Sequence, residues 1–314
     1  MRTYALRRLL LMIPVIMLVT VGVASLMRLV PGDPATLALG QEATEADREK
    51  FREAYHLNDS LPVQYVRWWN DVFHGNLGQS VVQRTNVTDE LKARLPSTLE
   101  LLVFAMILTV LIGVPFGIIS AVRQNTPIDY GIRLISIGGL SIPNFWLGTL
   151  LLIMPAIWWD YLPPLGKVGI TDDPLKNIQQ YFVPSLCLAI GGSAGIMRLT
   201  RSSMLEVLRN DYVRTAYAKG LKERVVIVRH TLKNALIPVV TVLGLQIAGL
   251  IGGAIIIETI FNLQGVGLFF ISSINFRDYP VVQGLVLFLA VVFLLVNLVV
   301  DLSYGVLDPR IRYS

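Results

Sequence analysis

The sequence predicts an all-α, polytopic membrane protein with six transmembrane helices and a small helical cap outside the membrane. Its 314 residues are 54% hydrophobic and only 16% charged, whereas about 25% of a typical soluble domain is charged. The apolar residues also gather in long uncharged windows, and a helix needs only about 20 residues to cross the hydrocarbon layer. These windows are Leu9–Met27, Leu101–Val122, Leu134–Trp159, Asn177–Met197, Asn234–Ile257 and Tyr279–Val300.

The first window has the position of a secretory signal peptide, because Arg2, Arg7 and Arg8 precede it. It is longer than the apolar region of a typical signal peptide, and the Pro-Gly-Asp that follows at 31–33 is no small-residue cleavage site. We therefore expect residues 1–30 to form an N-terminal tail and an uncleaved first transmembrane helix.

The distribution of basic residues predicts the orientation of the chain. With six spans both termini lie on one side, which carries sixteen Lys and Arg residues. The other side carries eleven, of which seven fall in the long segment 31–100. Because long loops cross the membrane regardless of charge, the comparison becomes sixteen against four and places both termini in the cytoplasm. This bias also explains the net charge of +5 without a nucleic-acid partner.

Residues 31–98 are predicted to form an extracytoplasmic cap of short amphipathic helices. Thr44, with Asp47 three residues later, is typical of a helix start, and Phe51, Ala54 and Tyr55 then share one face. A second helix is expected from Pro62 to Gly75. Its apolar stripe comprises Tyr65, Val66, Trp69 and Phe73. These side chains either pack on the outer ends of the spans or also receive a partner protein.

Two polar residues are candidates for lining a translocation path. Pro143 is expected to bend the third span, and Asn144 stands beside the bend. Glu258 closes the fifth window. A bend used only for packing, and a carboxylate at the membrane interface, are the simpler interpretations of these two features.

The sequence lacks the motifs of enzymes. There is no phosphate-binding loop for ATP, no nucleophile elbow and no HExxH metal motif, so we expect neither catalytic residues nor a metal site. The single cysteine, Cys187, excludes an intrachain disulfide. A conduit or a scaffold is the remaining class, and the lack of mid-span charges favours an external energy source over proton coupling. A self-sufficient channel or carrier, or a membrane scaffold, stays open as an alternative.

The basic segment 198–233 is predicted to lie in the cytoplasm as helix, glycine turn and helix. Asn210 or Asp211 begins a helix over Tyr212–Lys219, and Gly220 stops it in a left-handed turn. A second apolar stripe then leads to the fifth span at Asn234 and Pro238. It consists of Val225, Val228 and Leu232. Both ends of the segment are thus fixed at the membrane, which suits a docking surface that transmits force.

This segment, YVRTAYAKGLKERVVIVRHTLKNALIPVVT at 212–241, resembles the cytoplasmic EAA loop of the permeases of binding-protein-dependent ABC importers, in their dipeptide/oligopeptide/nickel group. The resemblance extends along the chain in LRRLLLMIP (6–14), RLVPGDPA (28–35), GNLGQS (75–80), RLPSTLELL (94–102), SIPNFWLG (141–148), GGAIIIETIFNLQGVG (252–267), RDYPVVQG (277–284) and LVVDLSYGVLDPRIR (298–312). The long outer segment is similar to that of the first, B-type, permease subunit.

The resemblance implies a type I ABC importer transmembrane domain in the inner membrane of a prokaryote, with a five-helix permease core at 99–310 and a tail at 311–314. It implies a second homologous permease subunit, two cytoplasmic ATPase subunits that bind ATP and Mg²⁺, and an outer solute-binding protein delivering substrate to the 31–98 cap. The chain itself would hold no cofactor. The ATPases would grip Tyr212, Val213, Arg214, Thr215, Ala216, Tyr217, Ala218, Lys219, Gly220 and Leu221. Peptides, glutathione and nickel complexes stay open as substrates.

Overall fold

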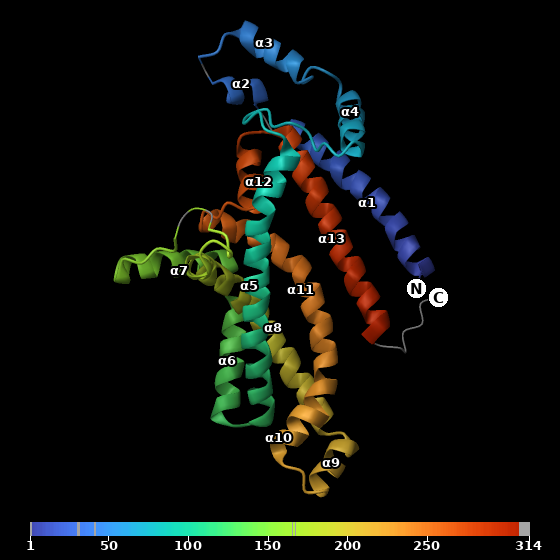
Figure 1. Cartoon of the computed structure of the whole chain (residues 1–314), viewed down its shortest axis with the longest axis vertical. Coiled ribbons are helices and arrows are strands. Elements are labelled where there is room, and N and C mark those ends of the chain that lie inside the picture. Colours follow the sequence, from blue (N-terminus) through green and yellow to red (C-terminus); the bar gives the residue numbers. More distant parts are fainter. Residues whose placement is uncertain (1, 30–31, 41, 165, 167, 308–314) are drawn as a thin grey trace. The chain divides into compact units, whose positions relative to one another are not determined.

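The computed structural model describes residues 2–29, 32–40, 42–164, 166 and 168–307, and the named secondary-structure elements within these residues are all helices. The helices are α1 (Arg2–Leu29), α2 (Pro34–Leu39), α3 (Glu45–Ala54), α4 (Leu61–Phe73), α5 (Val87–Val122), α6 (Pro127–Ser141), α7 (Asn144–Trp159), α8 (Pro174–Leu208), α9 (Asp211–Ala218), α10 (Glu223–Val225), the π-helix η1 (Val226–Leu232), α11 (Lys233–Ile260), α12 (Val266–Asn275) and α13 (Tyr279–Leu307) (Figure 1). The predicted tail at 311–314 lies outside the described residues.

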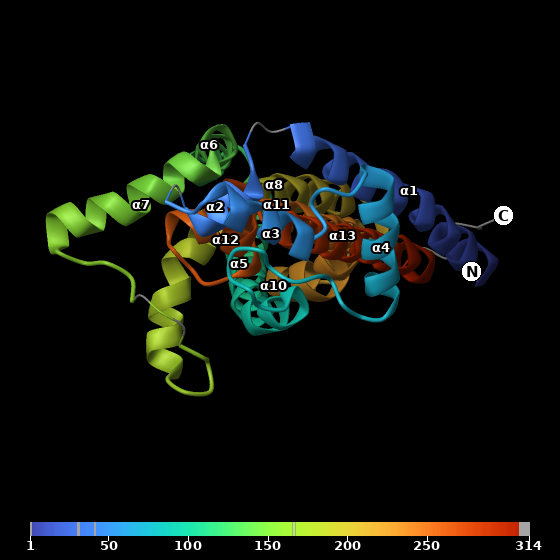
Figure 2. The ribbon, with the colours of Figure 1, turned by 90° about the horizontal axis from the view of Figure 1, so that it is seen from above.

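Five helices are long and apolar enough to cross a membrane without interruption, and they confirm five predicted spans. They comprise Leu6–Leu29, Val87–Val122, Pro174–Leu208, Glu223–Ile260 and Tyr279–Leu302. The remaining predicted span, the third in chain order, is divided between α6 and α7, whose axes differ by 101°. In Figure 2 α6 is viewed along its axis while α7 extends sideways from it. The break lies at Ile142, which the following Pro143 holds in an extended conformation with ψ of 122°.

The chain folds as two compact units. The first contains residues 1–98 and 264–298, and the second contains 99–263 and 299–312. In the first unit the start of α5 packs with α12 and the start of α13 through Val87, Val266, Phe269 and Leu285. In the second, α5, α8 and α11 share a core that includes Leu101, Leu188 and Ile257.

The cap helices begin where the sequence predicts. Thr44 accepts a hydrogen bond from the Asp47 amide at the start of α3, and α4 begins at Leu61 and ends just before Gly75, whose φ is +80°. Phe51 is buried against Ala35 and Val81, as expected for an inward face.

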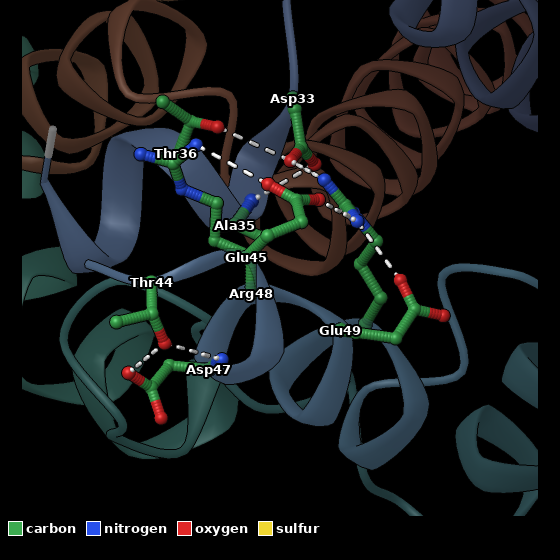
Figure 3. A network of polar contacts seen from close by, with 9 residues as sticks. Asp33, Ala35, Thr36, Thr44, Glu45, Asp47, Arg48 and Glu49 are labelled. Carbon is green, nitrogen blue, oxygen red and sulfur yellow. Dashed lines mark hydrogen bonds and ion pairs between the residues drawn. The ribbon is translucent and has the colours of Figure 1, made fainter.

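Charged contacts hold α2 against α3 in the cap. Arg52 donates to the carboxylate of Asp33 at 2.7 Å and to that of Glu49 at 2.9 Å. Figure 3 labels the acceptors Asp33 and Glu49 of this network. Burial alone would raise the pKa of Asp33, but the hydrogen bonds from Arg52 and the Ala35 amide outweigh it, so the pKa lies below its usual range. Asp33 therefore remains a carboxylate and keeps its contacts at neutral pH.

The predicted stripe of α4 is only partly correct. Tyr65 packs on α1, where its hydroxyl lies 2.8 Å from the Thr20 hydroxyl, so it does contact the outer part of the first span. Val66 and Phe73, however, are 68% and 81% exposed. The buried aromatic is Trp68, whose indole N–H donates to the Leu77 carbonyl. Ala54 of α3, also expected to face inward, is exposed.

A buried aspartate anchors the cap to the α12–α13 turn. Asp278 accepts hydrogen bonds from the Ser80 hydroxyl, from the Val81 amide at 3.2 Å and from the Val82 amide at 3.4 Å. Burial raises the pKa of this carboxyl above its usual range, despite these donors. The contact joins segments almost 200 residues apart in the sequence, and no local pattern indicated it.

Candidate functional site

Helix α9 follows α8 and precedes α10 in the chain, where the sequence predicts a short helix (Figure 1). It begins after Asn210, in an extended conformation, and ends at Lys219. Gly220 follows with φ of +77°, a left-handed conformation in which its amide donates to the Tyr217 carbonyl. The predicted helix and glycine stop are therefore confirmed to within a residue.

The inner face of α9 docks onto the following helix. Val213 and Ala216 are buried against Val226, the first residue of η1. The spacing of three residues places both side chains on one side of α9. A second tie is a hydrogen bond of 2.8 Å from the Asn234 amide nitrogen to the Tyr212 hydroxyl. The position of α9 is thus set by the helix that becomes the fifth span.

The other nominated residues of this segment lie exposed. They are Tyr212, Arg214, Thr215, Tyr217, Ala218, Lys219, Gly220 and Leu221. Both tyrosines remain 43% exposed. Partial burial raises the pKa of Tyr217, and the nearby Glu223 carboxylate raises it further. The outer face therefore combines aromatic surface with two cationic side chains, Arg214 and Lys219.

The helix after Gly220 differs from the prediction in phase and in length. Val225 and Val228, expected to face inward, are exposed, whereas Val226 and Thr231 are buried. The cause is η1, whose wider turn spaces the buried positions five residues apart, before Ala235 and Val239 follow at intervals of four. Helix α10, η1 and α11 also run on as one helix from Glu223 to Ile260, so the helix that contains the predicted apolar window Asn234–Ile257 begins before that window.

A charged cluster that the sequence did not indicate joins α5, α6 and α8 near the α5–α6 turn. Arg201 donates from Nε and Nη2 to the two carboxylate oxygens of Asp129 at 2.8 and 2.9 Å. Asp129 is fully buried and also accepts from the Ser120 hydroxyl and the Asn125 amide. With four donors around one carboxylate, the cluster is a fixed joint between three helices.

The two predicted path residues lie in different surroundings. Asn144 is the first residue of α7, beside the break, and a Cβ placed on Gly191 of α8 would come 3.0 Å from its Oδ1. Glu258 lies two residues before the end of α11 and is fully buried.

Two uncharged polar residues, Gln246 and Thr109, lie near Asn144. They were not predicted from the sequence because ionisable residues were the ones considered within the spans. Gln246 of α11 donates to the Gly192 carbonyl of α8 at 3.2 Å. Thr109 of α5 lies opposite the same glycine, and its buried hydroxyl has no hydrogen-bond partner among the described residues. The signal in the sequence is a lone Gln and a lone Thr within apolar windows.

The described residues contain no group of three or more His, Cys, Asp or Glu side chains that could hold a metal ion.

Comparison with known proteins identifies the family. Residues 113–313 match the family of binding-protein-dependent transport system inner membrane components, and residues 1–102 match the N-terminal family of the same membrane components.

The relatives align along the whole chain. An oligopeptide transport system permease protein, AppB, of Bacillus subtilis is 41% identical over 316 residues, which cover 100% of both chains. The dipeptide transport system permease protein DppB of Escherichia coli is 39% identical, and the glutathione transport system permease protein GsiC of Pectobacterium atrosepticum is 41% identical, each again over 100% of both chains.

Solved structures share the fold. An amino acid ABC transporter superposes with a TM-score of 0.52 at 16% identity, covering 71% of this chain and 95% of that one. The inward-facing MetNI methionine ABC transporter gives 0.53 at 15%, covering 69% and 96%. Together with the helical spans, these matches show that the chain belongs to the binding-protein-dependent transport system inner membrane components and is a multi-pass permease subunit of an ABC importer.

Proposed function

We propose that this permease moves peptides or related small solutes across the cytoplasmic membrane, driven by separate ATPase subunits. The relatives at about 40% identity are named for oligopeptide, dipeptide and glutathione transport, which supports a substrate with peptide bonds. The chain itself is non-catalytic, and ATP and Mg²⁺ bind to the partner ATPases.

The observation that carries the coupling role is the two-sided character of α9. Its inner residues Val213 and Ala216 pack against Val226, while Tyr217 and Lys219 remain exposed. A helix docked on one side and open on the other can fill a groove of a second protein without losing its own support. We assign residues 212–221 to the contact with the ATPase. The eight exposed residues would touch the ATPase, and the two buried residues, Val213 and Ala216, would hold α9 on its own chain.

Force would pass from this contact into the membrane through one continuous helix. Val226 carries the docked α9, and the same helix continues through η1 and α11 to Ile260. When the ATPase subunits close around ATP, they would displace α9 and tilt this span. The tilt would alternate access between the two sides of the membrane.

The remaining partners follow from the orientation of the chain. The basic bias places both termini in the cytoplasm, which leaves the 31–98 cap outside to receive a solute-binding protein. The core at 99–310 would pair with a second, homologous permease subunit, and the path would run between the two. Asn144 and Glu258 remain candidates for lining it, and Gln246 joins them because its amide donates to the carbonyl of Gly192, the residue after the Gly191 that Asn144 faces.

The test measures uptake and ATPase activity of the assembled transporter in proteoliposomes. Lys219→Glu reverses a charge on the exposed face and should abolish substrate-stimulated ATPase activity and uptake while the complex still folds. Arg229→Glu makes the same charge change on an exposed residue outside 212–221 and should retain both activities. Normal uptake after deletion of 212–221 would refute the coupling role.

Replacing the binding protein and substrate tests the substrate class separately. Uptake of radiolabelled di- or oligopeptides, competed by unlabelled peptide and unaffected by free amino acids, is the expected result. Uptake of amino acids alone would contradict it.

A further inference from the structure

A hollow between α6 and α8 brings three arginines together. It has a volume of about 370 Å³ and is lined by Ser120, Arg133, Ser136, Ile137, Arg198 and Arg201, together with Ile132 and Met197. Arg133 and Ser136 are one turn apart on α6, and Arg198 and Arg201 are one turn apart on α8. The hollow is therefore formed by matching faces of two neighbouring helices.

The floor of the hollow is preorganised. Arg201 uses Nε and Nη2 to hold Asp129, and a guanidinium has five N–H donors, so the Nη1 donors and one on Nη2 are not used by this pair. Asp129 is enclosed by its four donors and is fully buried. An anion entering the hollow thus meets arginine N–H groups rather than the carboxylate.

The rim carries two further cations. Arg133 and Arg198 are exposed, and neither forms an ion pair with a carboxylate in the part of the chain that the structure describes. Arg133 lies over the Tyr130 ring at 5.6 Å, which positions its side chain without neutralising it. Three arginines and one aspartate give the cluster a net charge of +2.

The position of the hollow along the spans matches the headgroup layer of a membrane. Arg198 directly follows Met197, where the uncharged window of α8 ends, and Arg133 lies six residues, or about 9 Å, into α6. Beside Arg133, the α6 side chains Leu134 and Ile135 are exposed and apolar. A ligand with a phosphate and acyl chains would satisfy both the arginines and this apolar surface.

We propose that this hollow binds a phosphate group, supplied by the headgroup of an anionic phospholipid in the cytoplasmic leaflet. The phosphate oxygens accept from Arg133, Arg198 and the free donors of Arg201, while the acyl chains lie along the outer face of α6. A free phosphate has the same recognition chemistry but makes no use of that apolar face.

The experiment counts lipid retained by the purified, intact transporter. The complex is extracted from nanodiscs of phosphatidylcholine with phosphatidylglycerol, washed in detergent, and analysed by native mass spectrometry. The wild type should retain phosphatidylglycerol in preference to phosphatidylcholine. Arg133→Gln with Arg198→Gln should weaken this retention by about tenfold or more, since each cation near the surface contributes to lipid attraction.

Two further variants make the result specific. Arg209→Gln removes an exposed charge directly after α8 and outside the hollow, so it should leave lipid retention unchanged. Arg133→Lys with Arg198→Lys retains the charge, so it should restore most of the binding and shows that the Gln variant has not simply misfolded.

Three outcomes would overturn the proposal. Equal retention of the two lipids, or an equal loss in Arg209→Gln, would mean non-specific surface attraction. Displacement of the bound lipid by millimolar inorganic phosphate, with phosphate then retained in the hollow, would assign the site to a soluble anion instead of a lipid.

Discussion

Arg201 of α8 and Asp129 of α6, which are 72 residues apart in the sequence, form a bidentate ion pair with N–O distances of 2.8 and 2.9 Å. Because Asp129 is fully buried, loss of its partner leaves a carboxylate without compensation in a region of low dielectric. The pair is therefore a point at which a single substitution should have a large effect.

Arg201→Met should destabilise the permease by about 3 kcal/mol, towards the lower end of the range for broken buried pairs because Arg201 keeps some solvent contact. The midpoint of thermal unfolding of the purified complex should fall by several degrees. Asp129→Asn in the same chain removes the buried charge and should restore part of the loss. Strictly additive effects of the two substitutions would show that the residues are not coupled.

Val213→Asp should release α9 from its own helix. A carboxylate at this buried position cannot remain against Val226, so the segment should detach and expose its backbone. Trypsin cleavage after Arg214 and Lys219 should accelerate by about tenfold or more, as expected for local unfolding. Val213→Ile keeps the apolar contact and serves as the control. Unchanged cleavage in Val213→Asp would contradict the docking of α9 described here.

Deleting Val228 should convert η1 to an α-helix without turning α9 around the helix axis. An exposed residue is removed, and the buried residues Val226 and Thr231 become four residues apart, which is the spacing of one face of an α-helix. We expect the transporter to assemble and to keep substrate-stimulated ATPase activity, because α9 remains docked on Val226. Val228→Ala removes the side chain but not the extra residue, and it should also remain active. Loss of ATPase activity in the deletion variant alone would show that the π-turn itself positions α9.

Asp278 should make the cap more stable in acid than at neutral pH. Its pKa is raised in the folded protein by burial, whereas the unfolded chain titrates near the usual value of about 3.9. Between these two values the native state binds more protons than the unfolded state, so stability falls as the pH rises. Hydrogen-exchange protection of the Val81 and Val82 amides, corrected for intrinsic exchange, should decrease from pH 4.5 to pH 7.

Asp278→Asn supplies the control for this pH dependence. The amide keeps an acceptor for Ser80 but cannot ionise, so the protection of the same two amides should no longer change between these pH values. Asp33 acts in the opposite direction, since its pKa is lowered and its contribution is lost only as the pH falls below its usual value. Measuring at Val81 and Val82 separates the two effects.

Features determined by neighbouring residues could be predicted from the sequence. Thr44 caps α3, Pro143 breaks the third span and Gly220 ends α9, because each acts through its own backbone or the adjacent turn. The six hydrophobic windows follow from length and composition alone.

Features determined by helix phase or by distant partners could not be predicted. The stripe at Val225 and Val228 assumed 3.6 residues per turn, and the π-turn adds one residue. Phe73 and Trp68 are both aromatic on one amphipathic helix, and only the fold decides which is buried. The Asp129–Arg201 pair depends on the register of α6 against α8, which no local pattern contains.

The helix from Glu223 to Ile260 is continuous, and this relates the angle by which it tilts to the distance that its two ends move. Its 38 residues extend about 57 Å, so a rotation of about 10° around its midpoint displaces each end by roughly 5 Å in opposite directions. Because no loop interrupts this helix, a small movement at the end that carries α9 is not absorbed before it reaches the other end. The geometry favours a permease that opens by a few degrees of tilt rather than by refolding of its spans.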